Sequence, residues 1–478
     1  MKRTIVIFML GLMLGSLVFS QSRIWTLEEC INHALIENIS INKKKLNIEV
    51  DQITLEQSKA NKIPSVNASG SQNFNFGRSV DPYTNIYTQN NFASNNFAMN
   101  ANWDVFNGFQ NKNTILKNEI DLKTGNFELE ETENNISLSI TQAYLQVLYS
   151  YEQIDNFKNK LESTRAQVKR TEALLRAGEV SEGNLFQIKA QEATDQYNLT
   201  NAENQLKIAK VSLMQLMELP VLNDFDVFQP DFRDSVLTLR IIESPEEIYQ
   251  TALKTQPEIA SSGLRVNSAE QSMKIAKGAS LPRITLSGGI NTGYSNNRSL
   301  YDRETFTQVQ EIGYLQSNPA EIVVADQQFS TLTQLNYPFT QQITDNFAQS
   351  LRLSLSIPIF SNKQIKSNIA KSRINIETAK LNQQDTENVL RKKIEQAYND
   401  MIAAAKNHDA ANEQLKNLAR SFSDSKRKYE LGMINATDFI IEQNQYFDSE
   451  SNLIRAKYQY IFMSKILEFY KGVPISLE

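Results

Sequence analysis

The chain has 478 residues and a formal net charge of −5 at pH 7. This mildly acidic balance argues against a nucleic-acid-binding protein, which normally carries a basic face. The single cysteine, Cys30, excludes an internal disulfide and a CxxC metal site, and we expect it to be a small buried side chain. The low content of Gly (16) and Pro (11) indicates a mostly helical protein.

The first 20 residues have the pattern of a secretory signal peptide. Lys2 and Arg3 precede an apolar run at residues 5–19, and Val18 and Ser20 are small enough for positions −3 and −1 of a cleavage site. A membrane anchor is the alternative, but this apolar core is short. No later segment approaches the roughly 20 apolar residues of a membrane-spanning helix. We therefore expect an exported chain without an evident lipobox.

Residues 26–62 predict one helix, with acidic residues in its first turn, where the helix dipole favours carboxylates. Residues 244–278 repeat this stretch at an offset of 218. Pro64 and Pro282 end the two helices. After each proline the apolar residues recur at every second position, which predicts two β-hairpins, at about 65–106 and about 283–360. The four strands are expected at residues 65–77, 97–106, 284–290 and 351–359.

Long polar loops are expected within these hairpins, at residues 78–91 and 296–345. The offset between matching residues grows from 218 at Pro282 to 254 at Phe360, so the second loop is 36 residues longer. A duplicated protein tolerates such an insertion where the loop lies outside the packed body.

Two very long helices follow, at residues 110–176 and 363–430, each about 100 Å long at 1.5 Å per residue. Small or apolar residues recur in both at alternating steps of four and three, which is typical of a coiled coil. Gly178 and Gly432 then predict left-handed helix stops. We call these recurring positions the seam. The seam of the first helix lies 254 residues before that of the second. The second comprises Leu390, Ile394, Ala397, Met401, Ala404, His408, Ala411, Leu415, Leu418, Phe422, Ser425 and Tyr429.

The predicted fold is therefore mostly α with a transmembrane β part, built as two tandem repeats. The first repeat covers residues 21–220 and the second covers 244–478, joined by a linker at 221–243. Each repeat contains a helix, a β-hairpin and a long helical hairpin. The helical hairpins are expected at about residues 110–217 and 363–470.

Four strands are too few to close a barrel, for which about eight is the practical minimum. Each unpaired backbone group in lipid costs several kcal/mol, so an open edge of about ten residues would cost tens. We therefore expect copies of the chain to share one barrel.

This pattern resembles the TolC-type outer-membrane efflux proteins. The resemblance is carried by the order and spacing of the duplicated elements, by the strand ends at residues 103–106 and 357–360, and by the turns at Gly178 and Gly432. It covers essentially the whole chain after residue 20. It implies a homotrimer with a twelve-stranded β-barrel in outer-membrane lipid and a long α-helical tunnel through the periplasm. It also implies a periplasmic adaptor and an inner-membrane pump as partners.

The resemblance assigns two sets of site residues. Tyr429 and Asp438 match positions of the family's pore gate. An arginine of that gate is replaced by Ile434, a second aspartate by Ile441, and the acidic partner in the first repeat by Asn184, so the gate is only partly present. Asp438 has a second interpretation, as a solvated carboxylate that stabilises a helix start. The two adaptor-docking turns comprise Ala177, Gly178, Val180, Ser181, Leu431, Gly432, Ile434 and Asn435.

The leading functional hypothesis is a passive exit duct for drugs, metal ions or exported proteins in a tripartite efflux or type I secretion system. The alternative is a periplasmic or surface coiled-coil scaffold or adhesin with soluble hairpins. An enzyme is disfavoured, because the chain has no GxGxxG or Walker loop and no pair of acids with a histidine. No cofactor or metal site is predicted, and His33 and His408 are expected to be packing residues.

Overall fold

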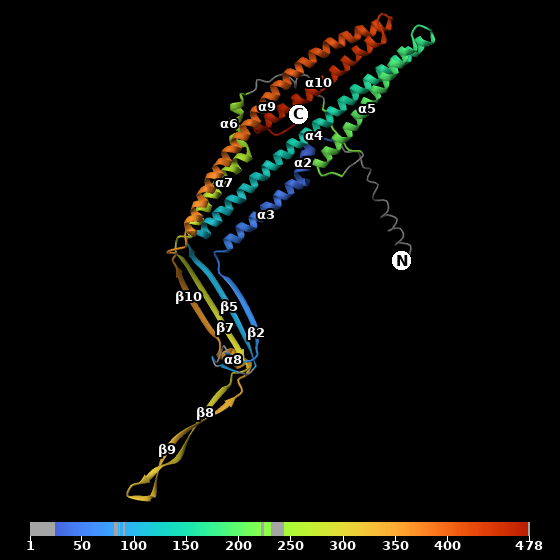
Figure 1. The fold of residues 1–478 in the computed structure, drawn as a ribbon. Coiled ribbons are helices and arrows are strands. Elements are labelled where there is room, and N and C mark those ends of the chain that lie inside the picture. Colours follow the sequence, from blue (N-terminus) through green and yellow to red (C-terminus); the bar gives the residue numbers. More distant parts are fainter. Residues whose placement is uncertain are drawn as a thin grey trace, which may run out of the picture. The chain divides into compact units, whose positions relative to one another are not determined.

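The computed structural model describes residues 24–80, 85, 87–88, 91–220, 224–230 and 243–476 (Figure 1). The predicted signal peptide lies outside these residues, as do most of the linker and the Asp81–Pro82 part of the first loop. The chain divides into two compact units. The helical unit comprises Met1–Leu55, Lys117–Glu270 and Arg373–Glu478, and the strand unit comprises Glu56–Leu116 and Gln271–Ser372.

Two long helices, α4 (Gln110–Arg176) and α9 (Gln364–Glu430), have 67 residues each, as the seam pattern predicts. The returning helices α5 (Glu182–Leu216) and α10 (Ala436–Tyr470) have 35 residues each and run back along them (Figure 1). Most of the predicted seam is buried, and its fully covered positions include Ile140, Val147, Leu390, Ile394 and Ala404. The seam prediction is therefore confirmed over the middle of both helices.

The predicted single helix at 26–62 is wrong, because the structure has α2 (Leu27–Glu37) and α3 (Ile39–Ala60). Asn38 between them is extended, and its amide accepts from the Ser40 N–H and donates to the Leu216 carbonyl. This exchange of backbone for side-chain hydrogen bonds breaks the helix.

The second repeat breaks at the same place, between α6 (Pro245–Thr255) and α7 (Pro257–Gly278). Gln256 lies between these helices in an extended conformation, because a residue before proline is disfavoured in the helical region. Both repeats start with a side-chain N-cap, since Thr26 and Ser244 each form a capping box with the glutamate three residues later.

The largest core cluster among the described residues lies in the helical unit and includes Cys30, Tyr144, Leu213 and Met217. Cys30 is fully buried, as expected. A short parallel pair, β1 (Ile24–Trp25) with β6 (Asp226–Val227), covers this cluster. The Tyr144 hydroxyl donates to the Phe228 carbonyl at 2.6 Å, and burial raises the pKa of this hydroxyl. Residues 24–25 and 226–228 are thereby held against α4.

The strand unit contains one antiparallel four-stranded sheet in the order β10-β7-β5-β2. Its strands are β2 (Ser65–Asn75), β5 (Phe92–Asn107), β7 (Arg283–Ser295) and β10 (Ala348–Ser356). The β5–β7 pairing joins the two predicted hairpins. In the described part of the chain, neither β2 nor β10 pairs with a further strand on its outer side. Apolar side chains on these edge strands are largely exposed, including Val66, Phe74, Leu351, Leu353 and Leu355.

The loop predicted at residues 296–345 is not irregular, which corrects the prediction. It folds as a ribbon of β8 (Leu300–Leu315) and β9 (Asn318–Leu335), followed by the short helix α8 (Phe339–Asp345). The shorter loop likewise contains a small pair, β3 (Ser79–Val80) with β4 (Tyr87–Thr88). Both faces of this ribbon are exposed, so its strands do not require an apolar face. Its sequence is therefore as polar as that of a loop. Among the described residues, no helix is both long and apolar enough to cross a membrane.

Candidate functional site

The two helix turns have the same backbone design. Gly178 and Gly432 adopt φ values of 77° and 74°, which are favourable for glycine and strained for most other residues. The Gly178 N–H donates to the Leu175 carbonyl, and the next N–H donates to the Leu174 carbonyl. Gly432 and the residue after it donate in the same way, so both helices end in a Schellman motif.

The residues predicted to dock an adaptor form exposed surface on these turns. Ala177, Gly178 and Ser181 are exposed in the first turn, with Val180 partly buried. Leu431 is 68% exposed in the second turn. There, Gly432 and Asn435 are also exposed and Ile434 is partly buried. Each turn therefore presents a small, mixed surface on a backbone fixed by its hydrogen bonds.

The predicted gate residue Tyr429 contacts the first helical hairpin. Its hydroxyl lies 3.2 Å from the Thr171 hydroxyl, and its ring stacks on Phe439 with 4.8 Å between centroids. Arg170 donates to the Glu430 carbonyl, and its guanidinium lies 6.0 Å from the centre of the Tyr429 ring. The end of α9 is thus joined to α4 by hydrogen bonds and aromatic contacts.

The second predicted gate residue, Asp438, lies in the first turn of α10 and is exposed. Its backbone N–H donates to the Asn435 side chain at 2.9 Å, which makes Asn435 the N-cap. The carboxylate lies in the first turn of α10, where the helix dipole favours a negative charge, and it is exposed to solvent. The neighbouring acid Glu442 accepts a hydrogen bond from Ser421 at 2.8 Å.

A polar stripe lies on α4, and the sequence analysis identified only its two threonines, Thr164 and Thr171, as positions of the predicted seam. The side chains of the stripe are nearly inaccessible although they are polar, and they recur at steps of three and four, with the other four beside the seam. That spacing is the signal that could have identified a second helix contact. The stripe comprises Gln153, Asn156, Lys160, Thr164, Gln167 and Thr171.

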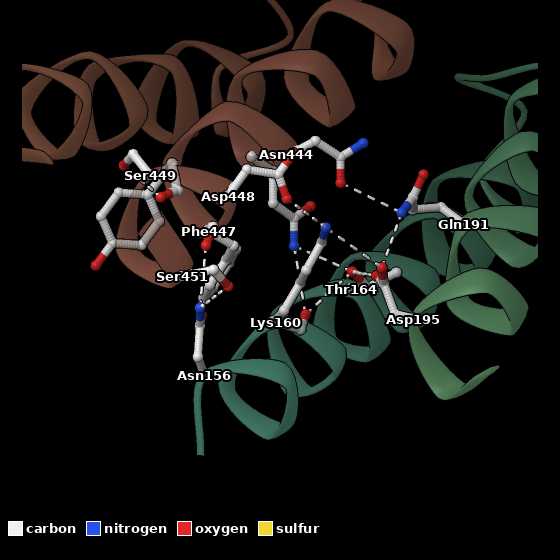
Figure 2. Close-up of polar contacts among 12 residues, drawn as sticks. Asn156, Lys160, Thr164, Gln191, Asp195, Asn444, Phe447, Asp448, Ser449 and Ser451 are labelled. Atoms are coloured by element: carbon white, nitrogen blue, oxygen red, sulfur yellow. Dashed lines mark hydrogen bonds and ion pairs between the residues drawn. The ribbon is translucent and has the colours of Figure 1, made fainter. Parts of the chain in front are cut away.

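Figure 2 shows how the centre of this stripe joins three helices. Lys160 on α4 lies 3.8 Å from carboxylate oxygens of both Asp195 on α5 and Asp448 on α10. Asp195 accepts hydrogen bonds from Thr164 at 2.7 Å and from Gln191 at 2.8 Å. The Lys160 and Asp195 side chains are 6% and 1% exposed, so removal of either partner leaves an uncompensated buried charge in the helical unit.

Further hydrogen bonds join the stripe on α4 to α10. Gln443 donates to the Thr164 hydroxyl at 3.0 Å, and the Asn156 amide donates to the Phe447 carbonyl at 3.0 Å and to Ser451 at 2.8 Å. The two helical hairpins are therefore held in register by directional bonds rather than by apolar packing alone.

The histidines make packing contacts. His33 lies edge-on to Trp25 at 5.3 Å between centroids, and His408 stacks near Tyr460 at 6.5 Å. Among the described residues, no group of three His, Cys, Asp or Glu side chains is placed to bind a metal ion.

A sequence model of the family described as "Outer membrane efflux protein" matches residues 30–218 and 248–469, one stretch in each repeat. The chain is 25% identical over 271 residues to the outer membrane efflux protein BepC of Brucella suis, a match that covers 55% of each chain. It is 26% identical over 169 residues to the pyoverdine export outer membrane protein OpmQ of Pseudomonas putida, covering 35% of each. The matched stretches thus span about half, or less, of the length of these curated relatives.

Solved structures match the fold over nearly all of the chain. The outer membrane protein VceC of Vibrio cholerae has a TM-score of 0.69 at 14% identity, covering 94% of this chain and 97% of that one. The CmeC outer membrane channel of Campylobacter jejuni has the same TM-score at 16% identity, covering 95% and 87%. The fold of this chain is thus shared with these two outer membrane proteins. This chain belongs to the outer membrane efflux protein family, which confirms the predicted resemblance and the two-repeat fold.

Proposed function

We propose that three copies of this chain form a passive exit duct in the outer membrane. The duct would complete a tripartite efflux or type I secretion system, with a periplasmic adaptor and an inner-membrane pump that supplies the energy. Family membership supports the channel, and the relatives named above are efflux and export proteins.

The observation that carries the proposal is the four-stranded sheet, whose two edges are unpaired among the described residues. Its edge strands β2 and β10 expose apolar side chains, as Leu351 at 79% and Val66 at 61% illustrate. These faces suit lipid, where open edges are too costly to persist. Pairing β10 of one copy with β2 of the next removes both edges. Three copies then give the twelve strands implied by the resemblance.

The site residues receive their roles within this proposal. The exposed turns at Gly178 and Gly432 would dock the adaptor, and Tyr429 with Asp438 would form part of the resting gate. The contact of Tyr429 with Thr171 supports the gate role, because opening a pore at the helix ends requires the two hairpins to separate there.

The deciding experiment is the mass of the detergent-extracted protein from isolated outer membranes, measured by light scattering. The duct predicts a trimer in the outer-membrane fraction that resists mild denaturant. A monomer in the soluble periplasmic fraction would instead support the coiled-coil scaffold, since the hairpins would then be soluble.

A further inference from the structure

The two faces of the four-stranded sheet differ in chemistry. One row across the strands, on the apolar face, comprises Val66, Ala101, Gly288 and Leu351. The adjacent row lies on the opposite, polar face, because successive side chains of a strand alternate. It comprises Ser65, Asn102, Ser287 and Arg352. In the proposed duct the apolar face meets lipid, so the polar face lines the lumen.

The four strands of this sheet carry few charges. Strands β2, β5, β7 and β10 contain three charged residues, Asp104, Arg283 and Arg352. The Arg283 guanidinium donates to both carboxylate oxygens of Asp104, at 2.9 and 2.7 Å, so this pair is neutral within the sheet. Arg352 is exposed and forms no ion pair with the described residues. It is therefore the one uncompensated charge of the four strands.

A neighbouring copy supplies no acid to Arg352 either. Arg352 lies on β10, the edge strand that pairs with β2 of the next copy in the proposed duct. Strand β2 contains no charged residue, so no register of this pairing brings a carboxylate opposite the guanidinium. The next strand of that copy, β5, carries only Asp104, which Arg283 already binds. Three copies thus leave a ring of uncompensated guanidinium groups on the lumen wall.

We propose that Arg352 gives the strand part of the duct a preference for anionic solutes, such as carboxylates and phosphates. Rings of arginine or lysine have this effect in pores, because they raise the local concentration of anions. The inference rests on the proposed function. It concerns a different part of the chain from the proposed gate, since Arg352 belongs to the strand unit and Asp438 to the helical unit.

The local charge can be measured with a thiol placed beside it. Ser350→Cys, in a Cys30→Ser background, adds one thiol on the same face of β10, about 7 Å along the strand from Arg352. The full chain, purified in an uncharged detergent, is treated with two methanethiosulfonates of similar size. One carries an anionic sulfonatoethyl group and the other a cationic trimethylammonioethyl group. The ratio of their rates reports the charge near the thiol and cancels any change in its intrinsic reactivity.

Substitution of Arg352 should change this ratio. Arg352→Gln should lower the anion-to-cation rate ratio at least about three-fold in about 0.01 M salt, and the effect should disappear at about 1 M salt because of screening. Arg352→Lys should retain the ratio, since it retains the charge. Arg303→Gln is the matched control, because it removes an exposed arginine from the separate β8–β9 ribbon.

Two other outcomes separate this inference from the duct itself. A ratio that stays within about two-fold in Arg352→Gln, or that falls equally in Arg303→Gln, would overturn the role of Arg352 and leave the duct standing. No reaction with either reagent would place the polar face away from the lumen, which would overturn both.

Ion selectivity provides the functional measurement. In an Asp438→Ala channel, which lacks the acid of the proposed gate, Arg352→Gln should shift the reversal potential in a potassium chloride gradient towards that of a cation-selective pore. The measurement is made in planar bilayers of uncharged lipid. An unchanged reversal potential would limit Arg352 to a local effect and overturn the proposed selectivity.

Discussion

Lys160 on α4 contacts carboxylates on both α5 and α10. It is the only cation drawn into the buried contacts of Figure 2, where it faces Asp195 and Asp448. Buried ion pairs add little over apolar packing, but loss of one partner is costly, because the other charge stays buried. This asymmetry makes the lysine a determinant of register rather than a general source of stability.

Lys160→Met should therefore lower the stability of the helical unit by about 3 kcal/mol. The measurement is the melting midpoint of the helical circular dichroism signal in detergent. Lys158→Met, on the exposed face of α4, is the control and should change little. Adding Asp195→Asn to Lys160→Met should restore part of the loss. If the single variant melts like the control, the buried ion pair does not stabilise the helical unit.

A pH-dependent contact links α3, α4 and α7. Lys44 and Arg265 bind Glu128 at 2.8 and 2.5 Å. Burial opposes ionisation of Glu128, but these cations outweigh it and hold the pKa of the carboxyl below its usual value of 4.5. A carboxyl with a lowered pKa in the folded state stabilises the protein above its unfolded pKa. That stabilisation is lost as the pH falls through the folded pKa.

Glu128→Gln should accordingly destabilise the helical unit at pH 7, by about 1 kcal/mol for a partly exposed ion pair. The difference should shrink below pH 4.5 and disappear once the native carboxyl is protonated. Melting midpoints of both proteins between pH 7 and 3 provide the check. A difference that persists unchanged at pH 3 would contradict the electrostatic origin.

At the scale of the element, a substitution in a glycine turn can test adaptor binding separately from insertion into the membrane. Gly178→Pro replaces a φ of 77° with a residue restricted to about −65° and should distort the turn. We expect loss of co-purification with the cognate adaptor and normal insertion into the outer membrane, because the turn belongs to the helical unit and the sheet to the strand unit.

Gly178→Asn is the matched control for the turn. Asparagine tolerates the left-handed conformation, so adaptor binding should be retained. Loss of outer-membrane insertion in the proline variant would show that the turn acts in folding, and unchanged adaptor binding would remove it from the docking surface.

The regular elements were predictable because each has one dominant periodicity. The apolar seam, the Gly178 and Gly432 stops and the alternating strands all followed from it. The helix breaks at Asn38 and Gln256 were not predictable from periodicity, because a single side chain or a following proline outweighs a long helical pattern there. The β8–β9 ribbon was not predictable either, because its stability comes from backbone pairing without an apolar face. Lys160 and the buried amides beside it were missed because the predicted helix contact included only the mostly small or apolar positions of the seam.

At the scale of the whole molecule, Asp438 tests the resting gate. Three copies would place three such carboxylates in a ring, which favours cations at a constriction. Asp438→Ala should raise resting conductance or reduce cation preference in planar bilayers. Glu203→Gln, an exposed acid elsewhere in the helical unit, should leave both unchanged. Identical conductance and selectivity in Asp438→Ala and the unmodified channel would leave the carboxylate only its favourable interaction with the helix dipole.

The duplication also predicts how neighbouring copies meet. Within one chain, α4 contacts α10 through Asn156 and Ser451. The matching positions, 254 residues away, are Ala410 on α9 and Tyr197 on α5. Both are exposed in the single chain, and Tyr197 is 66% exposed although it is large and aromatic. In a closed ring of alternating repeats, α9 of one copy should contact α5 of the next as α4 contacts α10 within a copy.

Cysteines at these two positions should therefore cross-link different copies. We expect Ala410→Cys with Tyr197→Cys, in a Cys30→Ser background, to give a covalent trimer on non-reducing gels after mild oxidation. Each single-cysteine variant should stay monomeric on the same gels, because its partner thiol is absent. A disulfide within one chain would show that α5 and α9 meet inside the protomer. If no link forms in a protein that light scattering shows to be trimeric, the copies do not follow the symmetry of the repeats.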